Sequence, residues 1–210
     1  MIKIKICGVT NSQDALWAAN LGADFVGLNF YAQSPRKVSP KNAGEIVKQL
    51  PPFVTCVGLF VNESAASIGK IVKSSGVKAV QLHGDETPEF CMAIKALGVK
   101  IIKAFRLQTP LDVSMLAAYE PAVDWYLFDY FSPDQVGGTG QTIDPSWLGD
   151  TSLIKKPWFL AGGLKPDNIE SILKQLKPPM VDVCSGVERS PTRKDYDAMK
   201  LFIQKTRSVR

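Results

Sequence analysis

The chain opens with Met1-Ile2-Lys3-Ile4-Lys5-Ile6-Cys7-Gly8-Val9-Thr10, in which isoleucine alternates with lysine before a thiol and a glycine. Such alternation with β-branched residues is typical of a strand, and Asn11 or Ser12 suits the N-cap of a following helix. Cys7 should therefore lie at the carboxyl end of the first strand, the edge at which parallel α/β folds bind ligands. The alternative is a packed core cysteine, since free cysteines are usually buried.

Apolar runs of strand type alternate with longer amphipathic segments along the whole chain. The predicted strands are Ile2–Cys7, Phe25–Phe30, Phe53–Val61, Ala79–His83, Lys100–Phe105, Trp125–Asp129, Trp158–Ala161 and Val181–Cys184. The predicted helices are Ser12–Leu21, Pro40–Leu50, Ala65–Ser74, Pro88–Leu97, Pro110–Tyr119, Pro166–Leu176 and Lys194–Thr206, with a short one near Pro145–Leu148 in the glycine-rich sixth connection.

Eight strand–helix units predict a parallel sheet and, by their number, an α/β fold of the (β/α)8 TIM barrel type. An open doubly wound sheet is the rival, although no GxGxxG motif follows the first strand. No linker or composition break divides the 210 residues. We therefore expect a single barrel domain with catalytic function over residues 1–210, a length ordinary for α/β barrels, ~200–250 residues.

Composition limits the partners that we expect. The net charge is +5, but aromatic residues do not interleave with arginines and no RNA-binding or helix-turn-helix signature occurs, so a small anionic ligand is favoured over nucleic acid. No window approaches the ~18 consecutive apolar residues of a membrane span, and the amino terminus does not resemble a signal peptide. We expect a cytoplasmic protein without a membrane partner, and a monomer, because no long apolar segment calls for a second subunit.

The cysteines and the histidine restrict metal chemistry. Cys7, Cys56, Cys91 and Cys184 are widely spaced and form no CxxC pair, which favours reduced thiols over a zinc cluster or a disulfide framework. His83 is the single histidine, so a multi-histidine metal site is excluded. A site built from carboxylates alone stays open, without a motif in its favour.

Three glycine-containing elements follow late strands: Gly137-Gly138-Thr139-Gly140, Ala161-Gly162-Gly163-Leu164 and Ser185-Gly186. The loops after the seventh and eighth strands of a barrel often bind phosphate through backbone amides, which glycine leaves accessible. The alternative is that these glycines only make tight turns. Two such loops at the expected strands, with a third before them, favour phosphate binding.

Four charged or titratable residues stand near other strand ends. Arg36, in the long loop after the second strand, could clamp an anionic group or simply be solvated. Asp129 ends an apolar strand, where burial would favour its protonated form and a role as an acid, or it caps the loop. His83 could be catalytic or scaffolding, and Lys103 inside the fifth strand is conceivable as a Schiff-base lysine.

The ordered set of motifs resembles the phosphoribosylanthranilate isomerase family of tryptophan biosynthesis over nearly the whole chain. The motifs are Lys5-Ile6-Cys7-Gly8, Ser34-Pro35-Arg36, Val57-Gly58-Leu59-Phe60-Val61-Asn62, Gln81-Leu82-His83-Gly84, Gly137-Gly138-Thr139-Gly140, Leu160-Ala161-Gly162-Gly163-Leu164 and Val181-Asp182-Val183-Cys184-Ser185-Gly186-Val187-Glu188. Each motif is weak alone, but their order is specific.

The resemblance implies an Amadori rearrangement of N-(5-phosphoribosyl)anthranilate, with no metal or organic cofactor. In that family the aspartate matching Asp129 is the general acid that opens the ring, and the cysteine matching Cys7 is the general base that removes the C2 proton. The arginine matching Arg36 engages the anthranilate carboxylate. The full set of substrate-binding residues that we expect is Arg36, His83, Gly138, Thr139, Gly140, Gly162, Gly163, Asp182, Ser185 and Gly186.

The chain departs from the family pattern at two places. After the glycine-rich loop it reads Ile143-Asp144-Pro145-Ser146-Trp147 where a Phe-Asp-Trp-like run is expected. Cys184 stands where serine or asparagine is expected, and we predict no structural disulfide between it and Cys7, because oxidation would remove the base. The competing readings are another phosphosugar barrel, such as an epimerase or indole-glycerol-phosphate synthase, and a non-catalytic phosphosugar-binding regulator.

Overall fold

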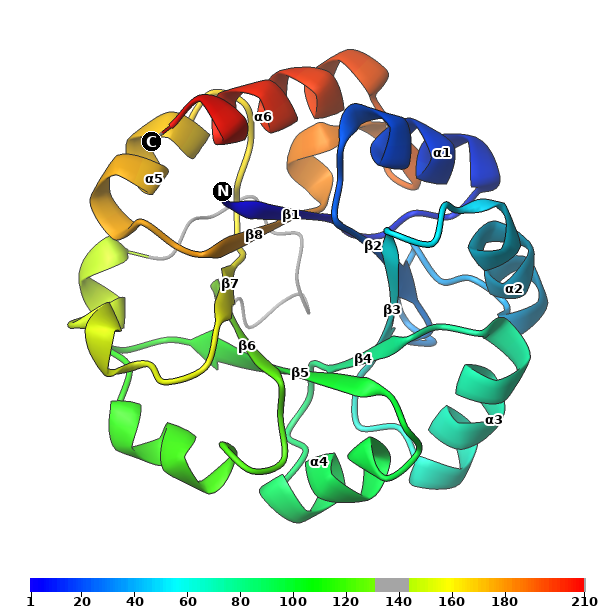
Figure 1. Ribbon diagram of the computed structural model, residues 1–210, viewed down its shortest axis with the longest axis horizontal. Coiled ribbons are helices and arrows are strands. Elements are labelled where there is room, and N and C mark those ends of the chain that lie inside the picture. Colours follow the sequence, from blue (N-terminus) through cyan, green and yellow to red (C-terminus); the bar gives the residue numbers. More distant parts are fainter. Residues whose placement is uncertain (131–143, 210) are drawn as a thin grey trace.

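The structure is a computed structural model in which residues 1–130 and 144–209 are described. Within these residues, eight parallel strands close into a barrel in chain order, and helices form the layer outside it (Figure 1). The strands are β1 (Lys3–Ile6), β2 (Phe25–Asn29), β3 (Thr55–Phe60), β4 (Ala79–Leu82), β5 (Lys100–Leu107), β6 (Trp125–Tyr130), β7 (Trp158–Leu160) and β8 (Met180–Val183). Because β8 pairs with β1 and closes the ring, the predicted (β/α)8 TIM barrel is confirmed.

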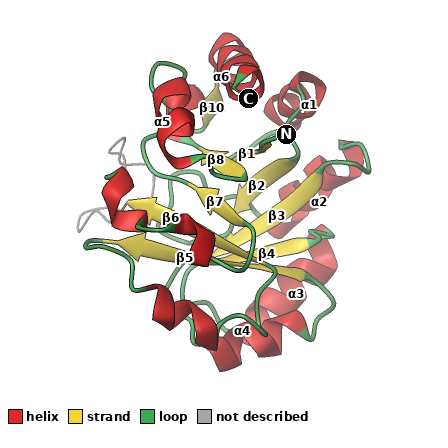
Figure 2. Cartoon of the chain, turned by 60° about the vertical axis from the view of Figure 1, so that its left-hand side comes forward, coloured by secondary structure: helices red, strands yellow, loops and turns green. Residues whose placement is uncertain are grey.

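In the described part of the chain, α-helices cover the outside of the barrel, as the turned view in Figure 2 also shows. They are α1 (Ser12–Leu21), α2 (Pro40–Gln49), α3 (Ala65–Ser75), α4 (Pro88–Lys95), α5 (Ile169–Leu176) and α6 (Tyr196–Ser208). The side chains of Asn11, Ser39, Ser64 and Thr87 each accept a backbone N–H in the first turn of α1, α2, α3 and α4. These caps satisfy donors that the helix leaves unpaired, which explains why α1 to α4 begin at the predicted residues.

Short polar side chains turn part of the outer layer into tight 3-10 helices. These are η1 (Val113–Ala118), η2 (Pro145–Leu148) and η3 (Thr151–Leu153). The carboxylates of Asp112, Asp144 and Asp150 each accept the N–H two residues later, a local bond that favours a turn over an α-helix. The helix predicted over Pro110–Tyr119 is therefore present only as the shorter 3-10 helix Val113–Ala118, and the short helix at Pro145–Leu148 is confirmed.

The last helix begins two residues later than predicted. Lys194 belongs to β10 (Arg193–Lys194), which pairs antiparallel with β9 (Glu188–Ser190). The backbone N–H of Lys194 donates to the carboxylate of Asp14 in α1 at 2.9 Å, and Asp195 then caps α6. This hairpin, which the sequence pattern did not indicate, holds the segment after β8 against α1.

Both faces of β1 are buried. Ile4 and Ile6 pack against the outer helices, whereas the fully buried Lys5 faces the barrel interior and donates to Asp182 of β8. The remaining interior is an apolar cluster of Phe25, Val57, Ala79, Ile102, Ala104, Leu127, Phe159, Ala161 and Met180. The alternation at the start of the chain thus separates isoleucines that face the helices from the lysine and thiol that face the barrel interior.

Candidate active site

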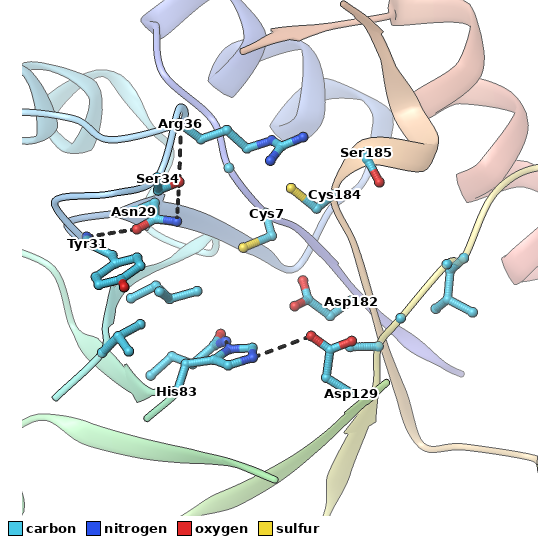
Figure 3. A pocket seen from close by; sticks show the side chains of 18 residues that line it. Cys7, Asn29, Tyr31, Ser34, Arg36, His83, Asp129, Asp182, Cys184 and Ser185 are labelled. Atoms are coloured by element: carbon cyan, nitrogen blue, oxygen red, sulfur yellow. Dashed lines mark hydrogen bonds and ion pairs between the residues drawn. The ribbon is translucent and has the colours of Figure 1, made fainter. Parts of the chain in front are cut away.

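A cavity opens at the carboxyl ends of the strands, and most of the expected site residues line it (Figure 3). Those that line it are Cys7, Arg36, His83, Asp129, Gly162, Gly163, Asp182 and Ser185. Gly186 is not among the lining residues, and Gly138, Thr139 and Gly140 lie outside the described residues. The cavity also receives Gln81 and Cys184, for which no role in substrate binding was predicted.

Cys7 occupies a space that two glycines leave open. A Cβ on Gly27 of β2 would lie 2.8 Å from the Cys7 Sγ, closer than real contacts allow. A Cβ on Gly8, whose φ is +69°, would lie 2.5 Å from the Cδ of Arg36 and 2.8 Å from the Sγ of Cys184. Glycine at these two positions therefore lets a thiol, a second thiol and a guanidinium approach one another at the end of β1.

The two thiols of this cluster differ in their surroundings. Cys7 and Cys184 follow the paired strands β1 and β8, and both sulfurs are free of disulfides. The neighbouring Cys184 thiol and burial raise the pKa of Cys7, against the attraction of the nearby Lys5 ammonium. The neighbouring Cys7 thiol, assisted by Lys194 and Arg36 and opposed by burial, lowers the pKa of Cys184 to about 6.

A buried ion pair lies beneath Cys7. The Nζ of Lys5 is 2.9 Å from Oδ2 of Asp182, and the side chains are 0% and 8% exposed. Burial raises the pKa of Asp182 to about 7, although Lys5 opposes the shift. Oδ1 of Asp182 is buried without a hydrogen-bond partner among the described residues. Because Asp182 lines the cavity, this oxygen is suited to accept a hydrogen bond from a hydroxyl group of a ligand.

On another side of the cavity, Gln81, His83 and Asp129 form a chain of polar contacts. Nε2 of Gln81 lies 2.7 Å from Nδ1 of His83, and Nε2 of His83 lies 3.3 Å from Oδ2 of Asp129 (Figure 3). If the amide nitrogen donates to Nδ1, a neutral imidazole carries its proton on Nε2, the ring nitrogen nearer the carboxyl group. Among the described residues Nε2 makes no hydrogen bond, so His83 lies beside Asp129 at the cavity without fixing it by a directed bond.

Arg36 is held by its own loop and by an ion pair. Its backbone N–H and the Nδ2 of Asn29 both donate to Oγ of Ser34, at 3.2 Å and 2.9 Å. Its Nε and Nη2 donate to the two carboxylate oxygens of Glu188 at 2.8 Å and 2.7 Å. Glu188 is shared with Lys194, whose Nζ is 2.9 Å away, so two cations face one carboxylate and a positive charge remains for an anionic ligand.

The loops after β7 and β8 also line this site. Gly162 and Gly163 have φ values of +88° and +59°, a left-handed conformation that favours glycine. A Cβ on Gly186 would collide with the carbonyl oxygen of Leu164, so this glycine lets the two loops pack together. Gly162, Gly163 and Ser185 line the cavity, and the backbone N–H groups of such loops suit a phosphate.

Lys103 is directed away from this cavity. Its Nζ donates to Glu86 at 2.8 Å and to the carbonyl of Gly84 at 2.7 Å, and the ion pair is buried. Its strand neighbours Ile102 and Ala104 belong to the apolar cluster inside the barrel. Lys103 therefore stabilises the loop after β4, and the Schiff-base reading is wrong for this residue.

Several residues of the site carry no local signal in the sequence. Glu188 and Lys194 reach it through the unpredicted hairpin, and Lys5 reads as one member of an alternating strand. Gln81 appears in a motif but is identified only by its contact with His83. The pairing of Lys5 with Asp182, 177 positions apart, depends on closure of the ring.

Two features of the described part of the chain bear on membrane and metal-binding proteins. No helix there is both long and apolar enough to cross a membrane. In the same residues, no three or more His, Cys, Asp or Glu side chains are grouped in a way that could hold a metal ion.

Comparison with known proteins gives one answer. A family model described as N-(5'phosphoribosyl)anthranilate (PRA) isomerase matches residues 4–205. The N-(5'-phosphoribosyl)anthranilate isomerase of Gloeothece citriformis (strain PCC 7424) is 45% identical over 205 residues, 97% of this chain and 93% of the relative. The crystal structure of phosphoribosyl anthranilate isomerase from Thermotoga maritima has a TM-score of 0.90 and 39% identity, with 99% of each chain covered.

A further solved structure of a similar protein carries a bound phosphosugar derivative. It is phosphoribosyl anthranilate isomerase in complex with reduced 1-(o-carboxyphenylamino)-1-deoxyribulose 5-phosphate, with a TM-score of 0.87, 38% identity and 99% of each chain covered. The family model spans almost the whole chain, and the identity to the curated relative extends over the same length. This chain belongs to the N-(5'-phosphoribosyl)anthranilate isomerase family.

Proposed function

We propose that Cys7 and Asp129 carry out the family's isomerisation in this chain, as general base and general acid. The reaction converts N-(5-phospho-β-D-ribosyl)anthranilate to 1-(2-carboxyphenylamino)-1-deoxy-D-ribulose 5-phosphate. The observation that carries the assignment is that a thiol from β1 and a carboxyl from β6 face one cavity, with Asp182 between them in Figure 3. Neither group is needed for binding a phosphosugar, which argues against a non-catalytic regulator.

In the first step, Asp129 gives a proton to the ring oxygen of the ribose. The C1–O bond breaks, the anthranilate nitrogen donates its electron pair to C1, and a protonated Schiff base results. His83 Nε2, 3.3 Å from Oδ2 of Asp129, is close enough to stabilise the negative charge that remains on the carboxylate when the proton leaves. A positioned acid of this kind contributes about 10²–10⁴-fold to the rate.

In the second step, the thiolate of Cys7 removes the proton from C2. The C2–H electrons form the C1–C2 double bond, and the former imine electrons return to nitrogen to give an enolamine. Loss of the C2 hydroxyl proton and protonation of C1 then yield the ketone. A thiolate suits this task, because its basicity is matched to a carbon acid next to an iminium group.

Two anionic ends fix the substrate across the cavity. The carboxylate of anthranilate pairs with Arg36, whose fork is only partly used by Glu188. The phosphate binds the backbone amides around Gly162, Gly163 and Ser185, with Gly186 and the loop of Gly138, Thr139 and Gly140 as further members. The Oδ1 of Asp182, which has no partner among the described residues, accepts a hydrogen bond from a sugar hydroxyl.

The relative that holds a reduced phosphosugar product supports a small anionic phosphosugar as the substrate. We extend the proposal to a cytoplasmic monomer in which residues 1–210 act as one catalytic domain. Exposed large apolar side chains of the described residues are scattered over separate elements, for example Phe53, Met92, Leu153 and Leu201, which favours a monomer. Light scattering of the purified enzyme at micromolar and higher concentrations tests this.

The proposed function is tested by following the loss of substrate fluorescence with wild type, Cys7→Ala and Asp129→Asn. We expect each variant to lose about 10²–10⁴-fold in kcat/KM. The buried Cys91, which does not line the cavity, provides the control Cys91→Ala. Turnover within a few-fold of wild type in either active-site variant would remove that residue from its role.

A further inference from the structure

Cys184 stands beside Cys7 because β8 and β1 are neighbours in the ring. Ile6 pairs with Val183, and the backbone N–H of Cys7 donates to the carbonyl of Val183 at 2.8 Å. The residue after each strand is therefore a cysteine, and both cysteines line the cavity next to Gly8. The mechanism described above uses only one of these thiols.

The groups around the Cys184 sulfur are mainly cationic. Nζ of Lys194 lies 3.9 Å from the Cys184 Sγ and 2.9 Å from its carbonyl oxygen, and the Lys194 side chain is fully buried. The guanidinium of Arg36 faces the same sulfur across Gly8. Among the described residues, Glu188 is the acidic side chain that binds both of these cations. A negative charge on Cys184 is thus compensated by fixed, buried partners.

The surroundings of the Cys7 sulfur are less favourable to charge. The nearby cation is Lys5, which is already paired with Asp182 at 2.9 Å, and Asp129 faces Asp182 from β6. The Cys7 side chain is nearly buried, with 6% exposure. In keeping with this asymmetry, the pKa of Cys184 is lowered to about 6 and that of Cys7 is raised. From these surroundings we expect the pair to hold one proton near neutral pH, with the proton on Cys7.

We propose that Cys7 and Cys184 form a proton-sharing thiol pair, in which Cys184 is a positioning residue that takes up the Cys7 proton and prepares Cys7 as the base. The step moves one proton from the Cys7 Sγ to the Cys184 Sγ. It converts a Cys7 thiol and a Cys184 thiolate into a Cys7 thiolate and a Cys184 thiol. No other bond changes, and the resulting thiolate receives a hydrogen bond from its neighbour.

During turnover the pair gains a second proton from C2 of the substrate and loses one to C1 of the enolamine, directly or through water. The proposal rests on Cys7 being the base. Its consequence is a rate that stops depending on pH once the pair has lost its first proton. A lone, nearly buried Cys7 would need alkaline pH to ionise, as an ordinary thiol does with a pKa near ~8.5.

The experiment compares pH profiles of kcat/KM for wild type, Cys184→Ala, Cys184→Ser and the control Cys91→Ala. In wild type and control we expect the acid limb near pH 6, with activity at pH 7 within about twofold of the plateau. In Cys184→Ala the limb moves more than one unit to alkaline pH, and at pH 7 the variant works roughly tenfold or more below its own plateau. Cys184→Ser retains a hydroxyl donor, so its limb also moves but its plateau stays closer to wild type.

The ultraviolet absorbance of the thiolate gives a second readout. It does not require catalytic activity, and the titration of Asp182 does not contribute to it. Wild type and Cys91→Ala should form one thiolate per chain near pH 6, and Cys184→Ala should form none there. Superimposable pH profiles for wild type and Cys184→Ala, or no thiolate in wild type below pH 8, would overturn the proposal. If Cys7→Ala stayed active, the proposed function would fail instead, whatever the profiles of the Cys184 variants.

Discussion

Arg36 and Glu188 form a two-point ion pair, with Nε–Oε1 and Nη2–Oε2 distances of 2.8 Å and 2.7 Å. The residues are 152 positions apart and come from the loop after β2 and from the hairpin after β8. The pair fixes the guanidinium plane before substrate arrives, and it leaves the remaining N–H donors for a carboxylate. Preorganisation of this kind reduces the entropy that binding must overcome.

Replacement of Arg36 by Met should raise KM roughly ten- to hundredfold with a smaller change in kcat, the scale of one charged hydrogen-bonded contact. Steady-state kinetics on the anthranilate substrate measure this effect. Arg189, exposed on β9, provides the control Arg189→Met. An analogue that lacks the carboxylate should bind wild type and Arg36→Met equally, and a KM difference that persists with the analogue would contradict the assignment.

The substitution Glu188→Gln should lower the free energy of unfolding by about 1.5–3 kcal/mol at pH 7, because Arg36 and Lys194 lose their shared anion. These two cations hold the pKa of Glu188 below its ordinary value, despite its burial. The stabilisation is therefore complete above the ordinary glutamate pKa of ~4.3 and is lost as pH falls through the lower folded value.

Urea titrations of wild type and Glu188→Gln between neutral and acidic pH check this sign. Their difference should shrink only at the acid end. Glu170, 45% exposed and 3.5 Å from Lys205, offers Glu170→Gln as a surface control with an effect of ~0–1 kcal/mol. A difference for Glu188→Gln that grew toward acid pH would show that the ion pair is not the cause.

The single histidine makes the His83 tautomer directly measurable by nitrogen NMR of the imidazole. We expect the proton of the neutral ring on Nε2, facing Asp129, because Gln81 Nε2 occupies Nδ1. Gln81→Leu should mix the tautomers and lower kcat by less than Asp129→Asn does. A wild-type spectrum with the proton on Nδ1 would contradict this. It would mean that Gln81 presents its oxygen to the ring and that Asp129 faces an unprotonated Nε2.

Gly27→Ala should disturb Cys7 and Lys5 together. The added Cβ would lie 2.8 Å from the Cys7 Sγ and 3.2 Å from the Cε of Lys5. We expect a loss of about 1–3 kcal/mol in unfolding free energy and a lower kcat, since overpacking displaces the thiol. In Gly69→Ala, where the nearest atom is 3.8 Å away inside α3, stability should instead rise by ~0.5–1 kcal/mol. Equal behaviour of the two variants would contradict the packing argument.

The barrel and the expected position of Cys7 were predictable because periodicity and helix caps are local properties. Asn11, Ser39 and Ser64 mark helix starts in the sequence itself, and each caps in the structure. The hairpin after β8 was not predictable, because β9 and β10 are three and two residues long and contain no alternating apolar pattern. A turn at Thr192, with a φ of +72°, also lacks the glycine that usually signals it.

The electrostatics of the site required the folded chain. Lys5 reads as a solvated lysine until β8 supplies Asp182, and Arg36 reads as a loop residue until Glu188 faces it. Likewise, the cysteine at position 184 is only a departure from the family pattern until Lys194 and Cys7 are placed beside it. Partners far apart in sequence decide these charges, so residue type alone did not identify them.

The division of labour between Cys7 and Asp129 is tested most directly by the kinetic isotope effect of substrate deuterated at C2. In Cys7→Ser, removal of the C2 proton should limit the rate, and a full primary isotope effect should appear on kcat. In Asp129→Asn, ring opening should limit the rate and the isotope effect should fall close to one. An isotope effect expressed in Asp129→Asn and absent in Cys7→Ser would contradict the account.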